Sequence, residues 1–262
     1  MKSEHLTSEC RPPIGPNGQY IIPSCYLDNE PPNCTQWESA SRELTLTGSN
    51  CLIKICYLIR CCNHLNPQCD KQACQIYIYS IGFVNEDEHD PNQPCETYVR
   101  CIWPYYYERN INEPAIKSII DPNCAMQFYK DCYKQLMDVL FLERLPEMGS
   151  EFYCQGNPCI PNIDCSPITF QFAMPKCTQM CYIGTDNSHE GWPIIYYTGC
   201  PMENSTCCVY NRQYCWCPEP SPGHMVTFEE WTTMYVNCEG VVPNMCPYDP
   251  DAINYGCIEM CP

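Results

Sequence analysis

The sequence lacks the motifs by which most enzymes and metal proteins are recognised. No two of its 27 cysteines are three positions apart, so the Cys-x-x-Cys pair of zinc ribbons, thioredoxin-like redox centres and c-type haem attachment sites does not occur. A His-Glu-x-x-His pair, a Gly-x-Ser-x-Gly elbow and a phosphate-binding Gly-x-x-x-x-Gly-Lys loop are also missing. Because no acid, base and nucleophile set can be nominated, we expect a protein that is not an enzyme and needs no cofactor or metal.

Positive charge and long apolar runs are scarce as well. The chain has 14 Lys and Arg against 31 Asp and Glu, which gives a net charge of −17. Nucleic acids and anionic membranes are bound through basic surfaces, so we expect neither as a partner. The longest apolar stretches are interrupted by Lys54 or Glu143, and they fall short of the roughly 18 apolar residues that a membrane span needs.

Cysteine is what the chain has in abundance. This density of cysteines is typical of disulfide-rich proteins, which persist in oxidising surroundings, so we expect an extracellular or cell-surface location. A metal-wrapped coil would not need the 20 Tyr, 7 Phe and 5 Trp of this chain. Since 27 is odd, at most about thirteen bridges can form within one chain. The remaining thiol is either buried and inert or pairs with another chain.

The modification sites expected from the sequence are cysteines in strand-like segments and two asparagines in glycosylation sequons. Asn33 and Asn204 begin Asn-x-Thr triplets. The candidate disulfide cysteines are Cys51, Cys56, Cys61, Cys62, Cys74, Cys207, Cys208, Cys215, Cys217, Cys257 and Cys261.

The first half of the chain divides into an arm and a hairpin. Residues 1–49 are rich in proline and predict an extended arm that leads into a strand near Glu43 to Thr47. From residue 50, apolar residues alternate with a period of two, and a second alternating run covers 74–84, which predicts an antiparallel hairpin. The parity places Cys51 and Cys61 on the core face, whereas Cys56 lies on the other face beside Lys54 and Arg60. A further strand is expected over 95–107.

One helix is expected, around 122–143, in the second part of a 50–148 hairpin-plus-helix region. Asp121 and Pro122 form an N-cap and a first-turn proline, and Phe128, Cys132, Leu136 and Leu140 recur every four residues. Residues 149–262 form a third region of short cysteine-bounded strands, 168–172, 176–184, 194–197, 207–215 and 225–236. We expect the segments on either side of 199–206 to pair as a meander. The predicted fold is therefore mainly β, with antiparallel sheets or a sandwich, rich in disulfides, and with one amphipathic helix.

Over about residues 50–262 the order of these segments resembles a group of uncharacterised cysteine-rich secreted proteins of environmental bacteria. The segments that carry the resemblance are Cys61-Cys62, Cys124 to Leu142, Asn157-Pro158-Cys159-Ile160-Pro161, Cys207-Cys208 and Cys257 to Pro262. The resemblance implies secretion and brings no catalytic motif with it.

Two functions remain open from the sequence. The first is a structural extracellular protein that polymerises with itself as a filament or appendage subunit, using the N-terminal arm. The second is a secreted module that binds glycans or calcium. The second would use aromatic clusters such as Tyr77 with Tyr79, Tyr105 to Tyr107, Trp192 and Trp216, or the acidic runs 85–90 and 249–251.

Overall fold

The structure is a computed structural model in which a long helix packs on a large β-sheet. It describes residues 10, 12–23, 26, 34–63, 72–84, 95, 98, 122–148, 153–154, 168–175, 177–183, 194–200, 207–232 and 253–259. The elements are β1 (Glu38–Thr45), β2 (Leu52–Asn63), β3 (Gln72–Phe83), α2 (Pro122–Met148), β4 (Ile168–Pro175), β5 (Cys177–Ile183), β6 (Ile194–Gly199), β7 (Cys207–Cys217), β8 (His224–Thr232) and β9 (Ile253–Glu259). The prediction of a mainly β, disulfide-rich fold with a helix that begins at residue 122 is confirmed for the described residues.

The sheet is mixed and branched. Strands β1, β2, β3, β4, β7 and β8 lie side by side in that order, and β6, β5 and β9 continue from the other half of β3. All described pairs are antiparallel except β3 with β4, which run parallel. The expected antiparallel pairing therefore holds for every described strand pair except this one. A parallel pair needs a long crossover, and the chain between β3 and β4 contains α2.

The hairpin of β2 and β3 forms where the period-two pattern predicted it. Its register pairs Ile53 with Phe83 at one end and Asn63 with Gln72 at the other, with a bulge after Cys56. Strand β1 begins five residues before the predicted start at Glu43 and pairs with β2 along its whole length. The alternation succeeds here because a strand with one buried face must place its apolar residues at every second position.

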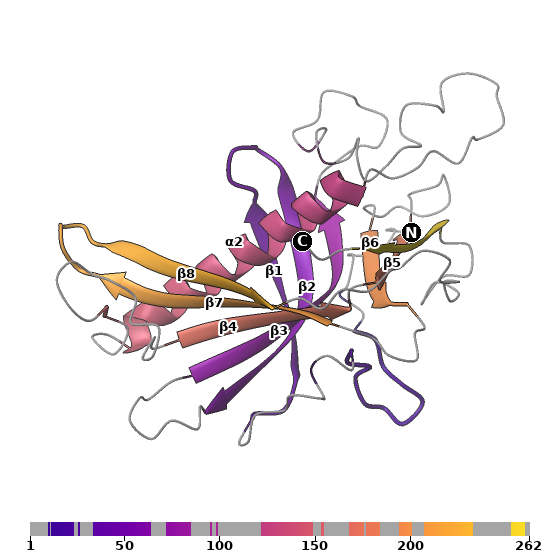
Figure 1. Cartoon of the computed structure of the whole chain (residues 1–262), viewed down its shortest axis with the longest axis horizontal. Coiled ribbons are helices and arrows are strands. Elements are labelled where there is room, and N and C mark those ends of the chain that lie inside the picture. Colours follow the sequence, from indigo (N-terminus) through magenta and orange to yellow (C-terminus); the bar gives the residue numbers. More distant parts are fainter. Residues whose placement is uncertain are drawn as a thin grey trace, which may run out of the picture.

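Helix α2 covers one face of the sheet, which it crosses diagonally in Figure 1. Phe128, Cys132, Leu136 and Leu140, spaced by four, are all buried against the sheet in the main apolar core. The helix runs through Pro146 to Met148, five residues beyond the predicted end. Proline supplies no N–H for the carbonyl of residue 142, but Leu142 is 45% exposed, where water can satisfy that carbonyl.

The opposite face is covered by the N-terminal segment. Tyr26 is fully buried there among Leu58, Tyr77 and Tyr79, with Trp37 packed beside it. A disulfide joins Cys10 to Cys56, on the same face. The described part of the arm is therefore bound to the sheet of its own chain.

The strands after residue 149 do not form the expected meander. Strand β6 pairs with β3 and β5, whereas β7 pairs with β4 and β8, so β6 and β7 are not neighbours. Strand β4 lies between β3 and β7. The regions 50–148 and 149–262 consequently contribute strands to one sheet.

Candidate functional site: two disulfides at the end of β2

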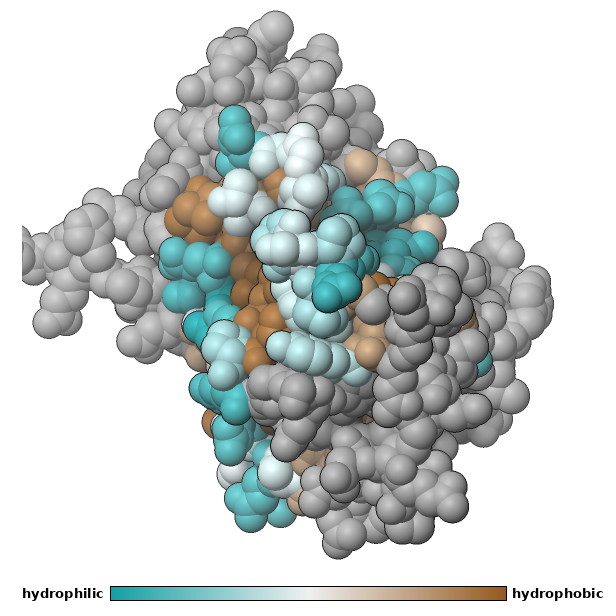
Figure 2. All heavy atoms as spheres, turned by 90° about the vertical axis from the view of Figure 1, so that its left-hand side faces the viewer, coloured by the Kyte–Doolittle hydropathy of each residue, from teal (hydrophilic) through white to brown (hydrophobic). Residues whose placement is uncertain are grey.

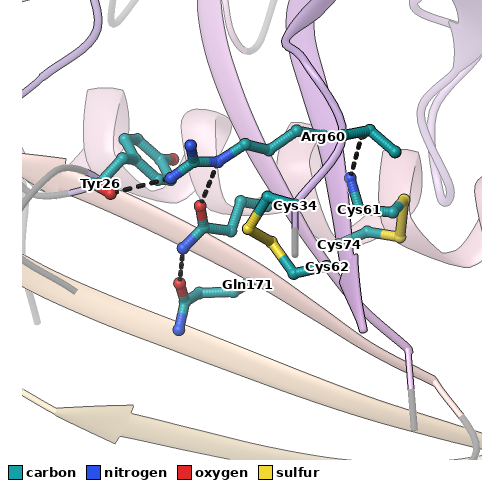
Figure 3. Close-up of a disulfide and its surroundings, with 9 residues drawn as sticks. Tyr26, Cys34, Arg60, Cys61, Cys62, Cys74 and Gln171 are labelled. Atoms are coloured by element: carbon teal, nitrogen blue, oxygen red, sulfur yellow. Dashed lines mark hydrogen bonds between the residues drawn. A yellow bond between two sulfur atoms is a disulfide. The ribbon is translucent and has the colours of Figure 1, made fainter. Parts of the chain in front are cut away.

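Two adjacent cysteines near the end of β2 form disulfides on opposite faces of the sheet. Cys61 is bonded to Cys74, its partner across the β2–β3 hairpin, with 4.0 Å between the Cα atoms. Cys62 is bonded to Cys34, with a Cα separation of 3.9 Å. Figure 3 shows these two disulfides side by side. Consecutive strand residues point to opposite faces, so one bridge lies on the helix side and the other on the arm side.

The Cys61–Cys74 disulfide contacts a cation from the helix. The guanidinium of Arg144, on α2, places Nη1 3.2 Å from Sγ of Cys74 and Nη2 3.2 Å from Sγ of Cys61. The same guanidinium lies 5.9 Å from the ring centroid of Phe170. Burial lowers the pKa of Arg144, and the carboxylate of Glu147 opposes that shift. A positive charge is thus held in a half-buried position against both sulfur atoms.

The two sulfur-bearing residues differ in exposure. Cys74 is fully buried, whereas Cys61 is partly exposed. A guanidinium beside sulfur stabilises a thiolate more than a neutral disulfide, because only the thiolate carries a charge. This bridge therefore combines one partly exposed cysteine with a cation that favours its cleavage products.

On the arm side, a row of polar side chains crosses four strands. Arg60 donates from Nε to Oε1 of Gln75 at 2.8 Å, Gln75 donates to Oε1 of Gln171 at 2.6 Å, and Gln171 donates to Oδ1 of Asn211 at 3.2 Å. These residues are direct neighbours in the register of β2, β3, β4 and β7. We call them the amide row.

Arg60 connects the amide row to the arm. Its Nη2 donates to the carbonyl of Tyr26 at 3.0 Å, and its guanidinium lies 4.6 Å from the ring of Trp37. Only 4% of Arg60 is exposed. Figure 3 shows this side chain reaching toward Tyr26, with Gln171 farther along the amide row. A one-residue slip of any of the four strands would break the row, so it fixes strand register rather than presenting a free ligand site.

A second charged cluster lies between α2 and the β7–β8 hairpin. Arg212, whose side chain is 9% exposed, forms hydrogen bonds to both carboxylate oxygens of Asp138 at 3.1 and 3.2 Å and an ion pair with Glu229. The hydroxyl of Tyr214 donates to Asp138 at 2.6 Å, and Lys134 pairs with Glu229 at 2.6 Å. Each charge here has an opposite partner, as a structural ion-pair network requires.

The candidate cysteines lie in several different disulfides. The structure pairs Cys51 with Cys95, Cys56 with Cys10, Cys215 with Cys154, and Cys257 with Cys200. Disulfides also include Cys207, Cys208 and Cys217, and beyond the candidate set Cys124, Cys177 and Cys181. Cys261 and both sequon asparagines, Asn33 and Asn204, fall outside the described residues.

Among the described cysteines only Cys132 is free, and it is buried. Burial, and then the negative charge of Asp131, raise the pKa of its thiol well above the usual value. Of the two alternatives left open by the sequence, a buried thiol and a disulfide to another chain, Cys132 therefore fits the first.

The aromatic and acidic candidates for ligand binding are only partly described. Tyr77 and Tyr79 are buried beneath the arm, and Trp216 is half-buried. Trp192, residues 105–107 and both acidic runs lie outside the described residues. In the part of the chain that is described, no group of three or more His, Cys, Asp or Glu side chains could hold a metal ion. No helix in that part has the length and apolar character needed to cross a membrane.

The sequence did not predict the contacts of Arg60 and Arg144, although it came closer for Arg60. The strand parity already placed Arg60 on the face of Cys56 and Cys62, so a signal for it existed. Arg144 lies one residue beyond the predicted helix end, and no local pattern connects it to Cys61 and Cys74, which are 83 and 70 residues away.

No protein-family model, curated protein or solved structure matches this chain.

Proposed function

We propose that this protein is an extracellular structural subunit that assembles with copies of itself by pairing the edges of its sheet. The disulfides support the compartment, because all described cysteines except the buried Cys132 are bonded. Such bridges would keep a subunit folded and resistant to proteases outside the cell.

The observation that carries self-assembly is the outer edge of β1. This strand has eight residues, most of them exposed, and it pairs with β2 on one side only. No strand among the described residues pairs with its other side. An unpaired edge strand presents a row of N–H and C=O groups that can accept a further strand.

The faces of the sheet are less suited than the edge of β1 to a contact between subunits, because other parts of the chain cover them. Helix α2 covers one face, and the arm, through Tyr26 and the Cys10–Cys56 disulfide, covers part of the other. Figure 2, which views the molecule from the β7–β8 side, shows brown hydrophobic residues between bands of teal and white rather than one broad apolar surface. The edge of β1, which lies inside the 1–49 region, therefore replaces the tip of the arm as the proposed contact.

The hydrogen-bond pattern identifies which residues of β1 face outward. Leu46 donates to the carbonyl of Cys51, so this residue pair is hydrogen-bonded and its even-numbered neighbours along β1 also face β2. The N–H groups of Ser39, Ser41 and Glu43 then point away from β2. A proline at position 41 removes an outward donor without removing a bond of the β1–β2 ladder.

Sedimentation velocity and negative-stain microscopy over a range of protein concentrations test the proposal. The unmodified protein should form polymers, Ser41→Pro should remain monomeric with its thermal unfolding little changed, and the matched control Ser41→Ala should still polymerise. A wild-type protein that stays monomeric at every concentration would exclude the proposed assembly. In that case a saturable signal on a glycan array or in a calcium titration would favour the binding-module alternative.

A further inference from the structure

We propose that the Cys61–Cys74 disulfide is a thiol–disulfide exchange site, which accepts a small external thiolate at Cys61 and releases Cys74 as the leaving thiolate. This reaction is separate from the proposed assembly, because it requires only the fold of the single chain.

Exposure decides which sulfur is attacked. Exchange requires the incoming thiolate to reach one sulfur along the line of the S–S bond. Cys74 is fully buried in the main core, whereas Cys61 is only partly buried at the end of the hairpin. The mixed disulfide should therefore form on Cys61.

Arg144 stabilises the group that leaves. Its Nη1 is 3.2 Å from Sγ of Cys74, the sulfur on which negative charge develops. Leaving-group thiols depart faster when their thiolate is stabilised, and a charged donor stabilises a thiolate more than a neutral one does. The chain contains a neutral comparison, because Sγ of Cys181 accepts a hydrogen bond from the amide of Gln179 at 3.4 Å.

The external thiol is the only reactant that this exchange needs besides the chain itself. The external thiolate forms a bond to Sγ of Cys61, the Cys61–Cys74 bond breaks, and its electron pair stays on Cys74. A second thiolate then attacks the external sulfur of the mixed disulfide. That step releases an oxidised external disulfide and leaves Cys61 as a thiolate, so two electrons pass from the external thiols to the bridge.

The neighbouring bridge allows this site to open without unfolding the chain. Cys62, one residue later on β2, remains bonded to Cys34 on the opposite face. The β2–β3 ladder continues from Cys61 through to Ile53. Opening of Cys61–Cys74 therefore loosens the hairpin near its Asn63–Gln72 end and leaves the rest of the sheet connected.

Limited reduction of the native, fully oxidised chain with reduced glutathione tests the proposal. Opened cysteines are alkylated with iodoacetamide at intervals and identified by peptide mass spectrometry. Cys61 and Cys74 should be modified before the cysteines of the other bridges, and glutathione should be found on Cys61 and not on Cys74. If all bridges open together, or if the disulfide of Cys181 opens first, the proposal is wrong.

Arginine variants separate the effect of the charge from general loosening of the fold. Arg144→Met should slow the opening of Cys61–Cys74 by about three- to tenfold, the size expected from losing part of one charge-assisted hydrogen bond in the transition state. Arg144→Lys should keep part of the effect. Arg42→Met removes an exposed ion pair to Glu143, on the same helix, and should leave the opening rate unchanged. An Arg144→Met variant that opens as fast as the wild type, or faster, would show that the cation has no role in exchange.

Discussion

The hydroxyl of Tyr26 accepts a hydrogen bond from the backbone N–H of Ala173, 147 residues later in the chain, at 2.8 Å. The same hydroxyl donates to the carbonyl of Ile76 on β3. Ile76 and Phe172 form the last pair of the parallel β3–β4 ladder, and Ala173 is the next residue of β4. The tyrosine therefore bridges the two strands at the point where their direct pairing ends.

These hydrogen bonds of Tyr26 help to explain how β4 and β6 can share one edge of β3. Beyond Ile76, the edge of β3 is next paired at Ser80, where β6 begins its short ladder. In the gap, the carbonyl of Ile78 accepts a hydrogen bond from the hydroxyl of Tyr129, on α2, at 3.0 Å. Two tyrosines, one from the arm and one from the helix, thus satisfy carbonyls that none of the described strands reaches. A buried carbonyl without a partner would destabilise the fold.

Replacing Tyr26 by phenylalanine should destabilise the fold, because it leaves the N–H of Ala173 and the carbonyl of Ile76 buried without this partner. We expect Tyr26→Phe to lower the free energy of unfolding by about 1–3 kcal/mol. Chemical denaturation measures the loss, and hydrogen exchange at the Ala173 amide should become faster. Tyr20→Phe, in the same arm, is the control and should change stability by less than about 0.5 kcal/mol. Equal effects of the two variants would contradict the bridging role.

Two glycines with almost the same backbone conformation give a matched prediction about packing. Gly223 has φ of +84° and Gly48 has φ of +82°. A Cβ at Gly48 would meet nothing within 4 Å, whereas at Gly223 it would lie 2.8 Å from the ring of Trp216. Gly48→Ala should therefore cost only the backbone strain, about 1 kcal/mol. Gly223→Ala should cost about 2–4 kcal/mol, because the indole must also move.

Thermal unfolding of the two variants measures this difference. The indole fluorescence should change in Gly223→Ala and stay the same in Gly48→Ala. Similar losses of stability in both variants would mean that Trp216 moves aside at no cost.

The sequence predicted those parts of the fold that follow from short-range periodicity. The alternation around Cys51 and Cys56 placed their side chains on opposite faces, and the structure bonds them to Cys95 and Cys10 respectively. The spacing of four from Phe128 onward likewise gave the buried face of α2. In both cases the residues that decide the pattern lie within one strand or a few helical turns.

The position of β4 could not be predicted in this way. Its place between β3 and β7 depends on the parallel register of Gln75 with Gln171 and the antiparallel register of Gln171 with Asn211. The amide row that joins these residues is a relation between strands far apart in sequence. Arg144 was missed for the same reason, because its contact with Cys61 and Cys74 exists only after the helix has packed on the hairpin.

The ion-pair network around Arg212 predicts how stability changes with pH. Burial alone would raise the pKa of Glu229, but the hydrogen bond from Lys134 and the positive charge of Arg212 outweigh it and lower the pKa below its usual value. A carboxylate with a lowered folded-state pKa stabilises the fold fully above its unfolded pKa of about 4.3. This contribution is lost as the pH falls through the folded-state pKa.

Comparison of the wild type with Glu229→Gln should therefore show a pH-dependent difference in Tm. The wild type should be the more stable protein, by a constant margin between about pH 5 and 7, and the margin should shrink below about pH 4. Glu230→Gln is the control, because Glu230 is exposed and lies on the opposite face of β8. It should have a much smaller effect on Tm at pH 7. A margin for Glu229→Gln that grows on acidification would contradict the arrangement.

The free thiol of Cys132 should be chemically inert in the folded protein. It is fully buried in the face of α2 that packs on the sheet, and its raised pKa keeps it protonated near neutral pH. Since the thiolate is the reactive form, native protein should not be labelled at Cys132 by N-ethylmaleimide at pH 8, whereas protein denatured without reductant should be. Cys132→Ala should cost about 1 kcal/mol through lost packing, and Cys132→Ser should cost more, about 1–3 kcal/mol, because its hydroxyl is buried. Neither variant should alter the migration of the protein on non-reducing gels. Rapid labelling of Cys132 in the native state, or a disulfide-linked dimer that Cys132→Ala abolishes, would show that this thiol is accessible and pairs between chains.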